Sequence, residues 1–135
     1  MRANRSIPVS TVIPVLGYAD VGEAADWLCA VFGFTVRLRI GDHRIQMNVG
    51  DGAVVLTALR GLDMARKSAV LVRVADADRL HARAIAAEVE ASAPTDHPYG
   101  ERQFSVTDLA GHAWTFSQSI ADVAPEDWGG ESGKL

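Results

Sequence analysis

The sequence has one cysteine, no excess of basic residues and no long apolar run. Cys29 cannot form an internal disulfide, and since it stands in an apolar helical pattern we interpret it as a small buried side chain rather than a reactive thiol. A formal net charge of −4 argues against nucleic acid or an anionic membrane as a partner. No apolar run approaches the roughly 20 residues of a membrane-spanning helix, and no apolar segment of a secretion signal follows Arg2 and Arg5. We therefore expect a cytoplasmic protein.

The motifs of several catalytic classes are also missing. The sequence contains no nucleophile elbow, no phosphate-binding loop, no dinucleotide fingerprint, and no carboxylate pair that strand register would bring together. The four histidines fall on different predicted elements, and no pair has the spacing of a metal site. We interpret each of them as exposed or structurally bonded: His43, His81, His97 and His112.

The run from Tyr99 to Gln118 predicts a β-hairpin. Large apolar side chains alternate with polar ones in both of its arms, which is the period of a half-buried strand. Between the arms, Asp108 can accept hydrogen bonds from its own turn and Gly111 can adopt a positive φ.

This run, G-E-R-x-F-x-V-x-D-x-x-G-H-x-W-x-F, resembles the closing hairpin of the vicinal oxygen chelate superfamily. That superfamily includes glyoxalases, ring-cleaving dioxygenases, fosfomycin-resistance enzymes and bleomycin-binding proteins. Outside the hairpin the resemblance is one of pattern more than of identity.

The chain contains two similar series of predicted elements. The first consists of a strand, a helix and three strands: Val9–Leu16, a helix from Asp20 to Gly33, Phe34–Ile40, His43–Val49 and Ala53–Ala58. The second follows a polar linker at Gly61–Lys67 and consists of Ala69–Val74, a helix capped by Asp76, a short strand at Glu90–Pro94 and the hairpin. Pro14 lacks a backbone donor, which favours an edge position for the first strand.

The repeat predicts two βαβββ units in an α+β fold. We expect one domain over residues 1–120, with units at 8–60 and 67–120, and a C-terminal tail at 121–135 in which Ala124 to Trp128 begins a short helix. The resemblance implies that the paired units form a U-shaped mixed sheet, with the helices outside and a ligand cleft inside. It also implies a homodimer.

Strand alternation predicts which side chains line the cleft. If Trp114 and Phe116 face the helix, the opposite row carries Arg73, Gln103, Ser105, Thr115 and Ser117. Tyr99, Glu101 and Arg102 would border the cleft from the preceding loop, and Trp128 could fold over it from the tail. Two alternatives remain open: Glu101 and Arg102 as a solvated charge pair, and Trp128 as a surface contact. The direction of the polar row with Arg37, Arg39, Gln46 and Asn48 is left undecided.

Metal-dependent members of the resembled superfamily place their ligands at positions that correspond here to Ile13, Leu56, Ala69 and Thr115. None of these four side chains binds a divalent ion well, so we expect no metal and no other cofactor. The resemblance then favours a protein that sequesters an aromatic or antibiotic-like small molecule. A glyoxalase-like lyase or isomerase, or a dioxygenase-related enzyme, is the alternative, so catalysis stays undecided. A third possibility is a structural or regulatory dimer without a ligand.

Overall fold

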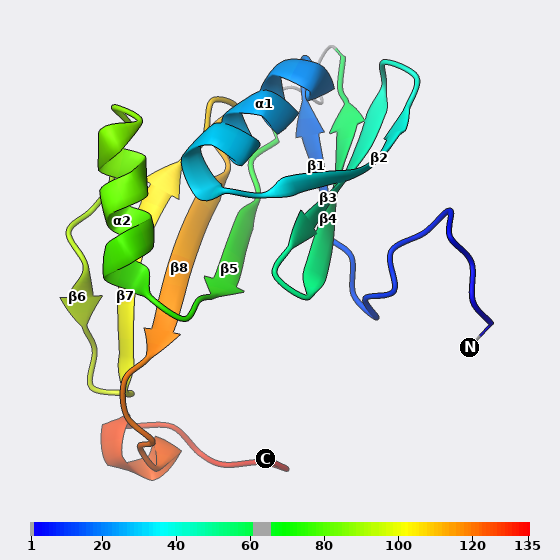
Figure 1. Cartoon of the computed structure of the whole chain (residues 1–135). Coiled ribbons are helices and arrows are strands. Elements are labelled where there is room, and N and C mark those ends of the chain that lie inside the picture. The colour runs from blue at the N-terminus through cyan, green and yellow to red at the C-terminus, as the bar shows by residue number, and fades with distance from the viewer. Residues whose placement is uncertain (1, 61–65) are drawn as a thin grey trace. The chain divides into compact units, whose positions relative to one another are not determined.

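The computed structural model describes residues 2–60 and 66–135, which divide into two compact units, Met1–Ser68 and Ala69–Leu135. Each unit has one α-helix and one four-stranded mixed sheet, which is the predicted α+β class (Figure 1). The linker predicted at Gly61–Lys67 lies largely outside the described residues. Within residues 2–60 and 66–135, no helix combines the length and the apolar character needed to cross a membrane.

The first unit contains five elements: β1 (Val15–Tyr18), α1 (Val21–Phe32), β2 (Thr35–Ile40), β3 (Arg44–Val49) and β4 (Gly52–Ala58). The strand order is β1-β4-β3-β2, with β1 parallel to β4 and the other neighbours antiparallel. The first strand therefore lies at an edge of its sheet, as Pro14 predicted. Its predicted start at Val9 is wrong, because the chain enters the ladder only after Pro14, whose carbonyl accepts from the Val55 amide.

The helix α1 begins and ends where its capping residues predict. The Asp20 carboxylate accepts from the Glu23 amide at 3.0 Å, and Gly33 ends the helix in the left-handed conformation with its amide bonded to the Cys29 carbonyl. On the apolar stripe of α1, Ala24 and Leu28 are fully buried, whereas Trp27 is partly buried. Cys29 is half-buried beside that stripe.

The second unit repeats the order of the first with β5 (Ala69–Arg73), α2 (Ala77–Ala86), β6 (Thr95–Asp96), β7 (Glu101–Thr107) and β8 (Ala113–Ser119). The strand order is β5-β8-β7-β6, with β5 parallel to β8. The Asp76 carboxylate caps α2 through the Arg79 amide, as predicted. The short strand predicted at Glu90–Pro94 is wrong: the segment bonds β7 through Ser92, but the strand that pairs with β7 is formed later, by Thr95 and Asp96.

The predicted hairpin is confirmed as β7 and β8, and it carries the core of the second unit. Phe104 and Val106 of β7 pair directly with Phe116 and Trp114 of β8, and all four side chains are buried. Helix α2 covers this face, where the His81 ring lies edge-on to Phe104 at 5.3 Å (Figure 1). Burial of these aromatic side chains, each contributing roughly 1.5–3 kcal/mol, makes them the main stabilising group of the unit.

The C-terminal tail is attached to the turn before β7. The amides of Ile120 and Ala121 both donate to the Gly100 carbonyl, and the short helix η2 (Pro125–Trp128) follows. The predicted helix start at Ala124 is confirmed, with Ala124 as the N-cap residue and Pro125 in the first turn.

Candidate functional site

The face of the β7–β8 hairpin that points away from α2 is a row of hydroxyl and amide groups. Gln103 lies opposite Ser117 and Ser105 opposite Thr115, as strand alternation predicts. The Gln103 amide donates to Ser117 Oγ at 3.0 Å, and the Ser105 and Thr115 hydroxyls share a hydrogen bond of 2.8 Å. We call Gln103, Ser105, Thr115 and Ser117 the polar row.

At the end of the polar row where β7 begins, further hydrogen bonds continue the row. Tyr99 OH donates to Gln103 Oε1 at 3.2 Å, and Ser117 Oγ donates to Glu101 Oε1 at 2.7 Å. The Arg73 guanidinium of β5 donates to Ser119 Oγ at 3.1 Å. The hydrogen bond from Ser117, assisted by Ser119 and by the charge of Arg73, holds the pKa of Glu101 below its usual value. The site therefore places the Glu101 carboxylate among hydroxyl donors, with the Arg73 guanidinium nearby.

Glu101 belongs to this site, and of the two interpretations that the sequence left open, a residue bordering the cleft or a solvated pair with Arg102, its bond to Ser117 favours the first. Successive residues of a strand point to opposite faces, so Glu101 shares a face with Gln103 while Arg102 shares a face with Phe104. Because β7 begins at Glu101, alternation extended by two residues from Gln103 places Glu101 on the face of the polar row. The paired interpretation of Glu101 and Arg102 is wrong.

Arg102 lies on the α2 side of the sheet. Its Nε donates to Asp78 Oδ1 at 2.9 Å and its Nη1 to Asp96 Oδ1 at 2.8 Å, and these two carboxylates raise the pKa of the guanidinium, Asp96 more than Asp78. Arg102 thereby joins β6, β7 and α2. Its contacts are those of a structural ion pair, separate from the polar row.

Three aromatic rings meet beside the polar row. The His97 and Tyr99 rings are stacked at 5.1 Å with an angle of 7° between their planes, and Trp128 tilts against Tyr99 at 5.4 Å. Trp128 is 44% exposed, whereas Trp114 is buried in the core. Trp128 is thus a surface contact that holds the tail against Tyr99, with part of its ring available to solvent.

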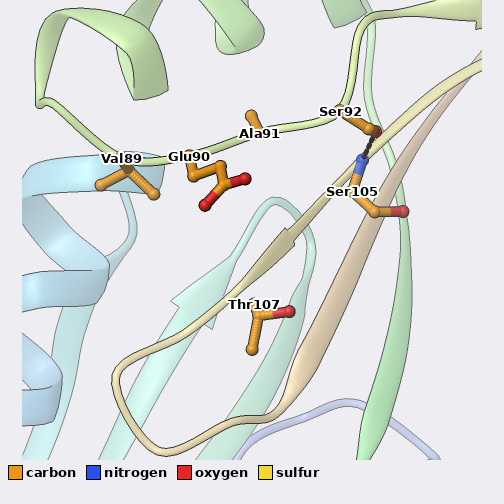
Figure 2. Close-up of a pocket in the computed structure, with 6 residues that line it drawn as sticks. All are labelled: Val89, Glu90, Ala91, Ser92, Ser105 and Thr107. Carbon is orange, nitrogen blue, oxygen red and sulfur yellow. Dashed lines mark hydrogen bonds between the residues drawn. The ribbon is translucent and has the colours of Figure 1, made fainter.

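A pocket of about 460 Å³ opens next to Ser105, between β7 and the segment that follows α2 (Figure 2). The Ser92 amide donates to the Ser105 carbonyl, and Ser92 Oγ accepts from the Ser105 amide at 2.8 Å. This pair of bonds closes one end of the pocket, and Figure 2 shows Glu90 and Thr107 across the opening from each other. The volume lies in the range of ordinary ligand sites.

In the first unit, polar side chains of the β2 and β3 strands are hydrogen-bonded to the protein's own N-terminal arm. The Arg37 guanidinium donates to Gln46 Oε1 and to the carbonyls of Arg5 and Ile7, and the Gln46 amide donates to the Ser6 carbonyl at 2.9 Å. The direction that the sequence left undecided is therefore settled for Arg37 and Gln46, which face the N-terminal arm. Asn48 bonds Thr35 across the β2–β3 ladder.

One expected metal-ligand position is corrected by the strand register. Val15 pairs with Val55 in the first unit as Leu71 pairs with Thr115 in the second, so Val55 corresponds to Thr115. Leu56 is instead the counterpart of Phe116 and is fully buried. Valine is no better a ligand than leucine. Among residues 2–60 and 66–135, no three His, Cys, Asp or Glu side chains are grouped as a metal site requires.

Comparison with known proteins places this geometry in a family. A solved structure of TioX from Micromonospora sp. ML1 is 32% identical, with a TM-score of 0.73 over 82% of this chain and 99% of TioX. A bleomycin-binding protein complexed with bleomycin is 18% identical, with a TM-score of 0.69 over 82% of this chain and 98% of that one. Lactoylglutathione lyase from Agrobacterium tumefaciens is 16% identical, with a TM-score of 0.68 over 84% of this chain and 96% of the lyase.

At these two lower identities the likeness shows the fold alone, and the same fold is carried by a binding protein and by an enzyme. No curated protein matches the sequence. The family model that matches describes residues 12–116, which is most of the chain. The protein therefore belongs to the Glyoxalase/Bleomycin resistance protein/Dioxygenase superfamily.

Proposed function

We propose that the protein binds an organic small molecule, aromatic or antibiotic-like, at the polar row, and that it does so without a metal ion. The single observation that carries the proposal is the row itself. Four small or medium polar side chains line one sheet face, and one of them, Ser105, also lines the pocket. A face of this kind offers room and directional hydrogen bonds, which are the two requirements of a specific organic-ligand site.

The residues at the expected metal-ligand positions support binding rather than metal-assisted chemistry. At these four positions Thr115 supplies one hydroxyl, and the other three side chains are hydrocarbon: Ile13, Ala69 and Val55, which takes the place of Leu56. Glu101 is the one carboxylate bonded to the polar row by the described contacts, and a single carboxylate is a weak site for any divalent ion. The glyoxalase-like enzyme remains the alternative.

The test is Thr115→Trp against Thr115→Val. Tryptophan would fill the space above the polar row, whereas valine keeps the size of threonine and removes only its bond to Ser105. With bleomycin and a panel of aromatic antibiotics, we expect thermal stabilisation of the wild type, a smaller shift in the valine variant and none in the tryptophan variant. An unchanged ligand shift in the tryptophan variant, together with stabilisation of the wild type by zinc, nickel or manganese, would favour the enzyme instead.

We further propose that the protein is a homodimer. Val15 of β1 and Leu71 of β5 occupy equivalent positions on edge strands of the two sheets, and they are 50% and 65% exposed. Large apolar side chains on an open sheet edge favour association. Light scattering that returns the mass of one chain at micromolar concentration would contradict the dimer. A dimer that responds to no ligand would support the purely structural alternative.

A cytoplasmic location remains our prediction.

A further inference from the structure

The charge in the lining of the 460 Å³ pocket in the second unit is negative and comes from one carboxylate. Its walls consist of one carboxylate, three hydroxyl-bearing side chains and two apolar ones: Glu90, Ser92, Ser105, Thr107, Val89 and Ala91. Among these described lining residues none is basic. The Glu90 side chain extends from the segment after α2 toward the opening that faces Thr107 (Figure 2).

The outer edge of β7 adds acceptors of its own. The Ser105 amide and carbonyl both bond to Ser92, which covers the edge at that residue. Because backbone groups two residues apart in a strand point the same way, the Thr107 carbonyl is directed to the same edge. Among the described strands none covers it there, since β6 pairs with β7 at Arg102 and Gln103.

From this arrangement we propose that the pocket binds a protonated amino group carried by the ligand. An ammonium group has three donors and no acceptor, which matches a carboxylate, the Thr107 carbonyl and the Thr107 hydroxyl. Val89 supplies an apolar wall for the carbon skeleton that bears the amine. The inference rests on the proposed binding function and specifies its ligand: an amine-bearing molecule, with the body of the ligand on the polar row and the amine at Glu90.

The experiment uses three probes that share one ring and differ in charge: 1-naphthylmethylamine, 1-naphthylmethanol and 1-naphthaleneacetate. Each is titrated into the full-length protein and followed through the backbone amide signals of Ser92, Ser105 and Thr107, which locate the site. We expect the amine to bind about fivefold more tightly than the alcohol at low salt, and the carboxylate to bind most weakly. The preference should shrink as ionic strength rises.

Glu90→Gln should reduce the amine to the affinity of the alcohol while leaving the alcohol unchanged. Glu88→Gln is the matched control, because Glu88 lies two residues away and does not line the pocket; we expect it to keep the full preference. Equal affinities of amine and alcohol in the wild type, or a preference that survives Glu90→Gln, would overturn the amine site while binding to the polar row stands. Absence of binding by all three probes would overturn both proposals.

Discussion

Gly100 is a position where the addition of a single methyl group should destabilise the fold strongly, because it combines a positive φ with a close backbone neighbour. Its φ is +82°, and a Cβ atom placed there would lie 2.4 Å from the carbonyl oxygen of Ala121. The backbone conformation alone costs alanine about 1–2 kcal/mol. Relieving the contact requires the tail to move and weakens the bond from the Ile120 amide to the Gly100 carbonyl, now 2.8 Å, which adds about 0.5–1.5 kcal/mol. Gly100→Ala should therefore destabilise the protein by about 2–3 kcal/mol.

Gly50→Ala is the matched control for this prediction. Gly50 also has a positive φ, +56°, but nothing lies within 4 Å of the position of its Cβ, so it should lose only the backbone cost of about 1–2 kcal/mol. Urea unfolding gives both free energies, and limited proteolysis of the tail reports the displacement separately. We expect faster cleavage after Ala121 in Gly100→Ala only. Equal losses of stability in the two variants, with the tail equally protected, would refute the role assigned to the contact with Ala121.

Two further predictions concern the hairpin, in addition to those on Thr115 and Glu90. Asp108 is 6% exposed and accepts hydrogen bonds from the amides of Ala110 and His112 and from Trp114 Nε1. Asp108→Ala should lower the free energy of unfolding, measured in urea, by about 3–4 kcal/mol. Asp108→Asn should lower it less, because the amide oxygen of asparagine keeps the two backbone hydrogen bonds. The lowered pKa of Glu101 adds stability that is present above about 4.5, the usual value, and is lost as pH falls through the folded value. Urea unfolding at pH 3 and pH 7 should show that Glu101→Gln lacks this acid-dependent loss of stability. An NMR titration should show that Ser117→Ala raises the pKa of Glu101. An unchanged pKa would contradict the assigned cause.

The elements with a repeated local signal could be predicted from the sequence. Asp20 and Asp76 each precede a helical apolar pattern and both cap their helices, and the alternation around Asp108 gives the register of the hairpin. The errors fall where periodicity carries no information. Val9 is apolar but 94% exposed, because an apolar run predicts a strand whether or not a partner strand reaches it.

Within the site, alternation placed the four members of the polar row, and the error at Arg102 came from assigning it to the loop before the strand rather than to β7 itself. Arg102 stands next to Gln103 in the sequence, yet its partners Asp78 and Asp96 come from α2 and β6 and hold it on the opposite face. Those partners are 24 and 6 residues away, and no pattern within one strand reveals them. Glu90 lies in an irregular segment, where no periodicity indicates the direction of a side chain.

The two units share one topology, so their differences in side chains indicate which unit carries the proposed ligand site. At the position where the second unit has Thr115, the first has Val55, and the polar groups that the first unit does have, Arg37 and Gln46, are bonded to its own N-terminal arm. The hydroxyls of the second unit bond one another within the row, and a hydroxyl pair can be opened by a ligand that offers better partners. The second unit therefore carries the features on which ligand recognition is proposed, and substitutions at Val55 should affect the stability of the first unit rather than binding.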